Sequence, residues 1–486
     1  MSEIKNLDPK DLWGYFSQIC EIPHPSKKEQ RMVEFVKNFG EEQGLETVVD
    51  ETGNVIIKKK ASPGMENRKT VVLQAHLDMV PQKNSDKEHD FEKDPIKAYI
   101  DGEWVTADGT TLGADNGIGI AAAMAVLSSG ELKHGPVEAL FTVDEETGMT
   151  GANNLKPGYL DAEILINMDS EDEGELYVGC AGGIDITAKK SYKEEPVPSD
   201  MVAYRVDAKG MKGGHSGIDI PLGRANSNQV LFRFLMQAEV DLNIKLSEAA
   251  GGDLRNAIPR ESYAIVLVPE DKTKGFESLV KEYDAMYKDE YGETEPEISF
   301  ACIKTDKPSG LVPEDEQYGI IRSVYGCPHG VLRMSTSMEG LVETSTNLAV
   351  VKVGNGNFEA LSLTRSSVDT AKEATAWKVA SIFQMMGAEI ELSGSYPGWK
   401  PNMKSPVLKT MQGVYDKMYG KIPEIKAIHA GLECGIIAGA YPHLDMISFG
   451  PTIRYPHSPD EKVNIETVKK FWDFLVGTLE AIPEKD

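Results

Sequence analysis

Apolar positions in the first third of the chain alternate between helical and strand-like spacing. Segment 8–19 carries apolar residues three and four positions apart after a proline, and segment 27–42 repeats this spacing, so both predict amphipathic helices. Short apolar runs predict strands at 55–57, 71–73, 138–143 and 163–167. Between the second and third of these runs, the alanine-rich segment 117–127 predicts a buried helix. This alternation predicts an α/β domain with a mixed, largely parallel sheet.

The pattern changes in the middle of the chain. Polar and apolar residues alternate at 201–208 and 263–268, as in half-exposed strands, and helical spacing begins near Ser227 and near Lys274. These segments predict a domain of the α+β class. The sequence shows no evident internal repeat.

A run rich in glycine, serine and proline at 393–401 ends this middle part. A helical pattern follows from Pro406, and a strand is predicted at 446–449. The 486 residues of the chain exceed the roughly 250–300 at which one hydrophobic core stops growing. We therefore predict a discontinuous first domain, 1–186 plus 397–486, and a second domain, 187–396, inserted into it.

The composition narrows the class of protein. A formal net charge of −26 argues against binding to nucleic acid or to an anionic membrane surface. The chain has no run of roughly 18–20 apolar residues and no signal-peptide pattern at its N-terminus, so we expect a cytoplasmic protein. Its five cysteines lack paired spacing, which argues against a disulfide framework and against a cysteine metal site.

The first candidate for a catalytic or metal-binding site follows the apolar run 71–75, which leads into His76 and Asp78. These two residues share a face if the extended conformation continues. A metal-bound imidazole commonly donates its other N–H to a carboxylate, so His76 is a candidate metal ligand and Asp78 its partner. An ordinary histidine and aspartate at a strand end would give the same pattern.

Asp115 lies in the segment Gly-Ala-Asp-Asn-Gly-Ile-Gly, directly before the predicted buried helix. An N-cap carboxylate would explain its position. However, the glycines at positions 113, 117 and 119 allow unusual turns and close backbone approach, which a carboxylate that bridges two cations needs. The sequence leaves both explanations open.

Three consecutive acids, Asp144, Glu145 and Glu146, follow the apolar run 138–143. Such crowding is unfavourable unless positive charge lies close by. At a strand end, neighbouring side chains point in different directions, so one of the two glutamates could bind a metal and the other act as a general base. A solvated acidic turn is the alternative.

Two further strand ends repeat this design. Asp169 follows the apolar run 163–167, at the carboxyl end where open α/β sheets bind ligands. His457 follows the strand at 446–449 in a rigid loop that is rich in glycine and proline. A lone histidine is more often a surface residue, so the other motifs give His457 its weight.

Taken in order, five motifs resemble those of the dinuclear zinc peptidase family that includes carnosinases, peptidase V, tripeptidase T and carboxypeptidase G. The motifs are His-Leu-Asp, Ala-Asp-Asn-Gly, Asp-Glu-Glu-Thr-Gly, Asn-Met-Asp-Ser-Glu and Pro-His-Ser-Pro-Asp-Glu. The resemblance covers essentially the whole chain. It implies a phosphorylase/hydrolase-like α/β catalytic domain, interrupted by an inserted α+β lid and dimerisation domain. It also implies a homodimer formed through that domain, with two Zn²⁺ per subunit, or Co²⁺ or Mn²⁺ in their place.

The resemblance further implies a role for each motif residue. The implied metal ligands are Asp115, shared by both metals, His76 and Asp169 on one metal, and Glu146 and His457 on the other. Glu145 would be the general base, and Asp78 would orient His76.

The segment Gly-Gly-His215-Ser-Gly matches a further motif of this family. Weaker matches suggest other residues that bind the substrate: Asn256, Arg365, His429 and Glu433. The resemblance implies that His215 approaches the substrate carbonyl, in relatives often from the partner subunit. Arg365 could clamp the C-terminal carboxylate of a peptide by charge-assisted bonds. Arg365, Asn256 and His429 could equally be structural.

The prediction is therefore metal-dependent hydrolysis of short peptides, above all dipeptides, including Xaa-His. A deacylase of N-acyl amino acids is one alternative, because the same metal core would attack any amide, and a broader di- and tripeptidase is another. A metal-dependent binding module without catalysis would have no use for a base beside Glu146.

Overall fold

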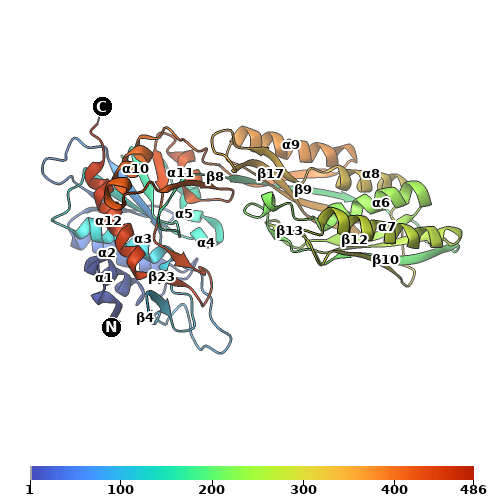
Figure 1. Cartoon of the computed structure of the whole chain (residues 1–486), viewed down its shortest axis with the longest axis horizontal. Helices are drawn as coiled ribbons and strands as arrows, with labels where there is room; N and C mark the ends of the chain where they lie inside the picture. The colour runs from blue at the N-terminus through green and yellow to red at the C-terminus, as the bar shows by residue number, and fades with distance from the viewer. Residues whose placement is uncertain (1–2, 486) are drawn as a thin grey trace. The chain divides into compact units, whose positions relative to one another are not determined.

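The computed structural model describes residues 3–485 of the chain. It divides into two compact units, of which the first is drawn mainly in blue, cyan and red and the second from green to orange (Figure 1). The second unit consists of Cys180–Lys400 and Ile428–Gly431, and the first unit of the remaining described residues. The boundaries expected after residue 186 and before residue 397 both lie inside the second unit.

A mixed sheet forms the centre of the first unit, in the order β1-β2-β6-β3-β7-β21-β8-β20. Its strands are β1 Glu46–Val49, β2 Val55–Lys59, β3 Val71–His76, β6 Val137–Thr142, β7 Ile164–Asn167, β8 Glu175–Cys180, β20 Glu424–Ile428 and β21 Asp445–Ser448. The central strands β6, β3, β7 and β21 pair in parallel, whereas β1, β2 and β8 pair antiparallel. The predicted mixed, largely parallel sheet is confirmed, and the central strands are buried on both faces, as parallel strands usually are.

The helices of the first unit include the ones predicted from the sequence. They are α1 Lys10–Ile19, α2 Gln30–Glu42, α3 Ala114–Ser128, α4 Glu145–Gly148, α5 Thr150–Asn154, α10 Pro406–Tyr419, α11 Glu433–Ala440 and α12 Ile465–Ala481. Helix α2 begins three residues later than expected, because Lys27 takes a left-handed φ of 68° that an α-helix cannot include. Gly117 lets α1 pack closely on α3, since a Cβ at this position would lie 2.9 Å from the ring of Phe16.

A small antiparallel sheet in the first unit has the order β22-β23-β5-β4. Its strands are β4 Ala98–Asp101, β5 Trp104–Ala107, β22 Ile453–Arg454 and β23 Lys462–Asn464. The loop that contains His457 connects β22 to β23, so this sheet fixes both ends of that loop.

The second unit is an antiparallel sheet covered by four long helices. The sheet has the order β15-β10-β14-β12-β17-β18-β9-β19. Strand β16 also pairs with β17, at residues that β12 does not reach. Its elements are β9 Gly182–Ser191, β10 Met201–Lys209, α6 Ser227–Leu242, β12 Lys245–Gly251, β14 Ser262–Pro269, α7 Thr273–Tyr291, β15 Ser299–Lys304, α8 Glu314–Gly326, β16 Gly330–Met334, β17 Val342–Gly354, β18 Asn357–Ser366, α9 Asp369–Met385 and β19 Glu389–Tyr396, with β11 Gly214–His215 and β13 Ala257–Ile258 as a separate short pair. One hydrophobic cluster joins the sheet to all four helices. The predicted α+β character is confirmed.

The second unit contains a structural repeat that the sequence analysis did not detect. The succession β10-α6-β12-β14-α7-β15 is a βαββαβ module, and β9-α8-β17-β18-α9-β19 is a second one. Numbering the strands within each module, the sheet order reads 4-1-3-2 for the first and 2-3-1-4 for the second. We call them the inserted module, which lies between β9 and α8 in the chain, and the flanking module.

Candidate active site

The five side chains predicted to bind metal meet at one edge of the large sheet of the first unit. His76 is the last residue of β3, Asp169 follows β7, Asp115 lies in the first turn of α3, Glu146 lies in α4 and His457 lies between β22 and β23. The carboxyl ends of the neighbouring parallel strands β6, β3 and β7 point to the same edge. The cluster therefore lies where the sequence predicted it, at the carboxyl ends of the parallel strands.

Asp115 stands between the two histidines of this cluster. Its Oδ1 lies 3.0 Å from His76 Nε2, and its Oδ2 lies 3.2 Å from His457 Nε2. Asp169 Oδ1 lies 3.3 Å from His76 Nε2, and Glu146 Oε1 lies 3.0 Å from His457 Nε2. The His76 side chain is 1% exposed and that of His457 is 51% exposed, so the cluster is open to solvent on the His457 side.

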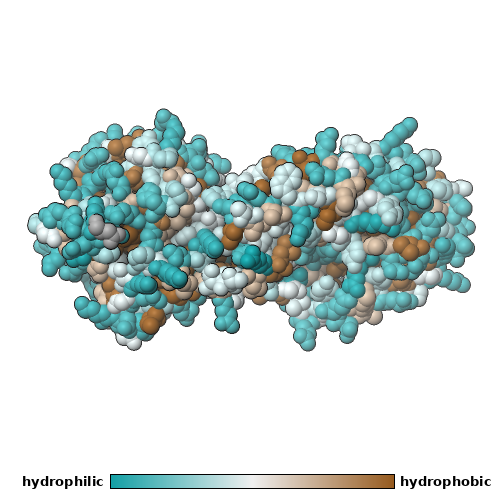
Figure 2. Space-filling view, turned by 90° about the horizontal axis from the view of Figure 1, so that it is seen from above, coloured by the Kyte–Doolittle hydropathy of each residue, from teal (hydrophilic) through white to brown (hydrophobic). Residues whose placement is uncertain are grey.

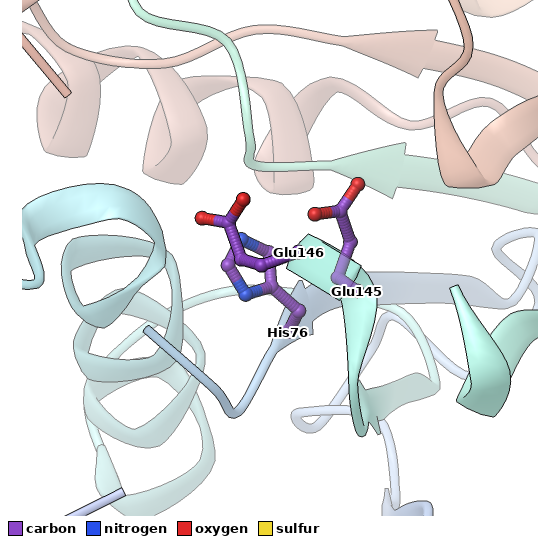
Figure 3. A group of neighbouring side chains, drawn as sticks. All are labelled: His76, Glu145 and Glu146. Atoms are coloured by element: carbon purple, nitrogen blue, oxygen red, sulfur yellow. The ribbon is translucent and has the colours of Figure 1, made fainter. Parts of the chain in front are cut away.

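Glu145 and Glu146 reach the cluster from a helix rather than from a strand end. Strand β6 stops at Thr142, Asp144 turns the chain with a φ of 53°, and both glutamates lie in the first turn of the short helix α4. Figure 3 shows their side chains extending from this turn beside His76, with Glu146 nearer to the imidazole. The expectation that the two side chains diverge because they end a strand is wrong, since the first turn of a helix separates them instead.

Asp78 holds both His76 and the start of α4. Its Oδ1 lies 3.3 Å from His76 Nδ1, and its carboxylate accepts N–H bonds from Glu145 at 2.9 Å and from Glu146 at 3.2 Å. Ser26 Oγ donates a further bond at 2.8 Å. Burial opposes the charge on Asp78, but the contact with His76 and these donors outweigh it and lower its pKa to about 2.

Glu461 caps the turn that presents Asp115, and the sequence analysis missed it. One oxygen of its buried carboxylate accepts the N–H groups of residues 112 and 113 at 2.7 and 3.0 Å, and the other accepts those of residues 114 and 115 at 2.8 and 3.3 Å. The amides at the start of α3 are thus capped by Glu461, while the Asp115 side chain remains directed at the histidines. Glu461 lies four residues after His457, in the motif Pro-His-Ser-Pro-Asp-Glu, and this position could have indicated a role at the site.

Burial and charge shift the pKa values of the cluster. Burial raises the pKa of Asp169 to about 6, against the opposing effect of His76. Contacts with Asp115 and Glu146 raise the pKa of His457 to about 11. Burial also raises the pKa of Glu145 well above its usual value. Burial is thus the main cause for the two carboxyl groups, and neighbouring carboxylates are the main cause for His457.

Two groups of three possible metal ligands share Asp115, and a further group joins His76 to Glu145 and Glu146. One group is His76, Asp115 and Asp169, and the other is Asp115, Glu146 and His457. Within each group the ligand atoms lie within 4.8 Å of one another. Imidazole nitrogens with carboxylate oxygens suit divalent cations such as Zn²⁺, Mn²⁺ and Co²⁺, so the residues fit a pair of cations bridged by one carboxylate.

The second unit contains a cluster of opposite charge around Arg365, which lies in β18 and is 5% exposed. Its guanidinium donates to Ser216 Oγ at 3.3 Å and to Tyr396 Oη at 3.1 Å, and it lies 3.5 Å from His215 Nε2. His215 Nδ1 accepts the N–H groups of residues 217 and 218, so Nε2 carries the proton of the neutral ring. Among the described residues, no carboxylate lies within ion-pair distance of Arg365.

The remaining predicted substrate residues are distributed over both units. His429 is buried in the second unit and hydrogen-bonded to Ser345 Oγ at 2.7 Å, and burial together with Arg365 and His215 lowers its pKa to about 3. Glu433 belongs to the first unit, where its carboxylate accepts bonds from Gln74 at 2.6 Å and Thr142 at 2.8 Å. Asn256 is exposed, and its carbonyl oxygen accepts the N–H of Ser216.

Comparisons with known proteins agree with this geometry. Residues 72–481 match the model of Peptidase family M20/M25/M40. The chain belongs to this family. It is 47% identical, over the full length of both chains, to the cytosol non-specific dipeptidase of Escherichia coli. It is 49% identical to the aminoacylhistidine dipeptidase of Vibrio alginolyticus, whose crystal structure superposes with a TM-score of 0.96 over 100% of this chain and 99% of that one.

A structure with much lower sequence identity shares the fold of this chain. The aminopeptidase PepT of Bacillus cereus covers 98% of this chain and 99% of its own at 16% identity, with a TM-score of 0.57. Membership in Peptidase family M20/M25/M40 confirms the prediction that the chain is a hydrolase acting on peptide bonds. The matched segment begins inside β3, four residues before His76, and ends with α12, so it contains the whole cluster of the first unit. Among residues 3–485, no helix is long and apolar enough to cross a membrane.

Proposed function

We propose that the chain is a dipeptidase that uses two divalent cations and accepts Xaa-His among its substrates. The observation that carries this proposal is Asp115, whose two oxygens face two different histidine and carboxylate groups. The relatives named as a non-specific dipeptidase and as an aminoacylhistidine dipeptidase, both nearly half identical to the chain, support the substrate class.

His76, Asp115 and Asp169 would hold one cation, and Glu146 and His457 would hold the second together with Asp115. Bound cations of this kind lower the pKa of a water molecule and polarise the scissile carbonyl. Zn²⁺ is our first choice because catalytic zinc sites combine imidazole with carboxylate ligands, and Co²⁺ or Mn²⁺ would suit the same donors. Asp78 would fix the tautomer of His76, because its carboxylate faces His76 Nδ1.

Glu145 would act as the general base. It is adjacent to Glu146, and the Glu145 carboxylate extends beside His76 without being part of either group that shares Asp115 (Figure 3). In the proposed reaction a Glu145 oxygen takes a proton from the attacking water and then gives it to the leaving amine nitrogen.

Arg365 would bind the C-terminal carboxylate of the substrate. A buried guanidinium without a carboxylate partner is costly, and a bidentate bond to a carboxylate ligand would relieve this cost. His215 would donate its Nε2–H to the carbonyl oxygen as negative charge develops there. Asn256, His429 and Glu433 would complete the substrate contacts. Binding the substrate at its carboxylate limits the length of peptide that is accepted.

An N-acyl amino acid deacylase remains the second candidate, because Arg365 would bind the carboxylate of an N-acyl amino acid equally well. Turnover of a panel of Xaa-His dipeptides, other dipeptides, tripeptides and N-acetyl amino acids separates the two functions. A preference for N-acetyl amino acids over every dipeptide would refute the dipeptidase assignment.

The role of Glu145 is tested by Glu145→Gln, with the exposed Glu88→Gln as a matched control. We expect kcat to fall by roughly 10²- to 10⁴-fold, the range for loss of a general base, while metal content and KM stay close to wild type. The control should leave all three unchanged. Near-normal turnover of Glu145→Gln with both metals bound would exclude Glu145 as the base.

Three broader expectations complete the proposal. The discontinuous domain 1–186 plus 397–486 would be the catalytic domain, and the inserted domain 187–396 would serve as a lid and dimerisation domain. The chain would form a homodimer through the inserted domain. The name of the Escherichia coli relative places that protein in the cytosol, and we propose the same compartment for this chain.

A further inference from the structure

A row of polar side chains crosses the large sheet of the first unit, directly before the residues that lead to two of the proposed metal ligands. Gln74 on β3, Asn167 on β7 and Ser448 on β21 are register partners on neighbouring parallel strands. Residues two apart on a strand share a face, so Gln74 lies on the same face as His76. Asn167 likewise comes two residues before Asp169. We call Gln74, Asn167 and Ser448 the polar row.

The polar row is buried, and the row of residues before it is apolar. Gln74 and Ser448 have no exposed surface, and Asn167 is 1% exposed. Val72 and Leu165 form the preceding row on the same face of β3 and β7. Hydrophilic residues cover most of the molecular face in Figure 2, where water hydrates them, whereas a buried amide costs free energy unless its donors and acceptors find partners. Apolar groups of the same shape can replace a bonded pair at little cost, so stability alone does not account for the polar row.

Hydrogen bonds join the polar row into one chain that ends at Glu433. Gln74 Nε2 donates to Glu433 Oε2 at 2.6 Å, and Asn167 Nδ2 donates to Gln74 Oε1 at 2.5 Å. Ser448 Oγ donates to Asn167 Oδ1 at 2.5 Å and lies 2.6 Å from Ser170 Oγ. A carboxylate only accepts hydrogen bonds, so Gln74 must turn its NH₂ group to Glu433 and its carbonyl oxygen to Asn167. One orientation of each side chain therefore follows along the whole chain of bonds.

This chain of bonds ties β3 to β7 at the point where their pairing ends. The ladder between the two strands ends at the pair Gln74↔Asn167, and the side chains of this same pair are bonded to each other. Beyond the pair, one segment continues to His76 and the other to Asp169, whose Oδ1 lies 3.3 Å from His76 Nε2. The bond between Gln74 and Asn167 thus holds together the two strand ends that set this distance.

The ligands of the second group do not depend on the polar row. Glu146 belongs to α4, and His457 lies in the loop between β22 and β23. In the described part of the chain, no hydrogen bond joins the polar row to either segment. The two proposed cations therefore differ in what supports their ligands.

We propose that the polar row positions the ligands of one cation, the one held by His76, Asp115 and Asp169, and not those of the other. This inference rests on the proposed function, because it concerns the two cations that the dipeptidase would use. The residues of the polar row would bind neither metal nor substrate. They would act only through the spacing of the strand ends of β3 and β7.

The test replaces the whole polar row in the triple variant Gln74→Met/Asn167→Leu/Ser448→Ala. Both amides are removed together, so neither is left buried without its partner, and the metal-free protein should unfold close to the wild-type temperature. Leu165→Met, in the apolar row of the same face, is the control for altered packing. Elemental analysis during titration with a chelator gives the Zn²⁺ bound per chain, and circular dichroism follows unfolding of the metal-free protein.

We expect the triple variant to bind one Zn²⁺ with wild-type affinity and the other about 10- to 100-fold more weakly, the range for residues that orient metal ligands. Turnover of an Xaa-His dipeptide should return at excess Zn²⁺, and Leu165→Met should bind both cations as the wild type does. Unchanged affinity for both cations would overturn the proposal, since the polar row would then serve the fold alone. Equal weakening of both cations would also overturn it.

Two variant backgrounds identify the affected cation. His457→Ala removes a ligand of the second cation, so the Zn²⁺ that remains should bind more weakly when the triple variant is added. His76→Ala removes a ligand of the first cation, and adding the triple variant to it should leave the affinity for the remaining Zn²⁺ unchanged. The reverse pattern would contradict the proposal.

Ser448→Ala alone provides a second test if the triple variant does not fold. It removes one donor from the chain of bonds, so a smaller loss of affinity is expected at the same cation, and unchanged affinity would overturn the proposal. Failure of the wild type to bind two Zn²⁺ would overturn the proposed function and this inference together. If the wild type binds two Zn²⁺, the variants test the inference alone.

Discussion

The two clusters of this molecule differ in charge and in how the chain assembles them. In the first unit, three carboxylates and two histidines crowd one edge of a parallel sheet, and burial raises the pKa of Asp169 to about 6. In the second unit, a buried guanidinium is surrounded by hydroxyl groups and neutral histidines. The first environment has a surplus of carboxylates, and the second has a buried guanidinium with no carboxylate within ion-pair distance among the described residues, so they are suited to cations and to a substrate carboxylate, respectively.

This contrast predicts a separation of kinetic effects. Variants of the first cluster should change metal content and kcat. Variants of Arg365 and of the residues that orient the bound substrate should change KM and leave the metals in place, whereas variants of His215, which would donate to the developing negative charge, should also change kcat. The four predictions below test that separation, in order of decreasing effect.

The largest effect is expected from Asp115→Asn. An amide offers one ligand oxygen where the carboxylate offers two, so the residue can no longer serve both groups. We expect loss of both cations and a fall in kcat/KM of more than about 100-fold, because loss of a merely supporting residue already costs roughly 10- to 100-fold. Metal analysis after gel filtration and steady-state kinetics provide the measurement.

The control for this variant is Asp101→Asn, at an exposed position in β4. It should retain wild-type metal content and activity. Retention of two metals per chain by Asp115→Asn would show that Asp115 is not shared between the groups, and the contrast between the two clusters would lose its main support.

Arg365→Met should give the next largest effect and should leave the metals in place. A hydrogen bond to a charged group contributes about 1.5–3 kcal/mol, which corresponds to roughly a 10- to 150-fold loss in kcat/KM. The loss should come from KM and should appear only with substrates that have a free C-terminal carboxylate. A C-terminally amidated dipeptide should be a poor substrate for both enzymes and should show little difference between them.

Arg205→Met is the matched control, because Arg205 pairs with Asp207 on β10, away from the Arg365 cluster. Its KM should equal that of the wild type. An equal loss by Arg365→Met on free and amidated dipeptides would mean that Arg365 stabilises the fold and does not bind the carboxylate.

The same contrast explains which parts of the molecule the sequence could predict. In the first unit, β3, β6 and β7 each lead from an apolar run to candidate residues. Local motifs therefore singled out His76, Asp169 and the Glu145–Glu146 pair as candidates, and the structure brings the carboxylates close to His76. The helical turn that carries those two glutamates was not predicted, because only the αL conformation of Asp144 ends the strand early.

In the second unit the cluster comes from distant segments of an antiparallel sheet. His215, Arg365 and His429 carry no strand-end pattern, and their proximity depends on tertiary packing that a single sequence does not display. The structural repeat was missed for a related reason. The second module is interrupted by the first, so its strand β9 and helix α8 lie more than a hundred residues apart in the chain.

Glu461→Gln should weaken metal binding without removing any ligand. The carboxylate accepts four backbone N–H groups, and a glutamine would turn an NH₂ group toward two of these donors. We expect metal affinity to fall by about 10- to 100-fold, as for other residues that position ligands, and activity to return with excess metal. Chelator competition measures the affinity, and the exposed Glu466→Gln is the control. Full affinity in Glu461→Gln would mean that the cap does not position Asp115.

Ser345→Ala should give the smallest effect and should act through His429. Ser345 Oγ lies 2.7 Å from His429 Nε2, and His429 has a pKa of about 3 because burial, Arg365 and His215 all disfavour its charge. The hydroxyl therefore orients a neutral ring, a contact worth about 0.5–1.5 kcal/mol, which predicts a two- to tenfold rise in KM at unchanged kcat and metal content. Ser381→Ala, on the exposed side of α9, should have no effect. If Ser345→Ala lowered kcat or metal content instead, His429 would act in the chemical step or at the metal site, and its assignment to substrate binding would be wrong.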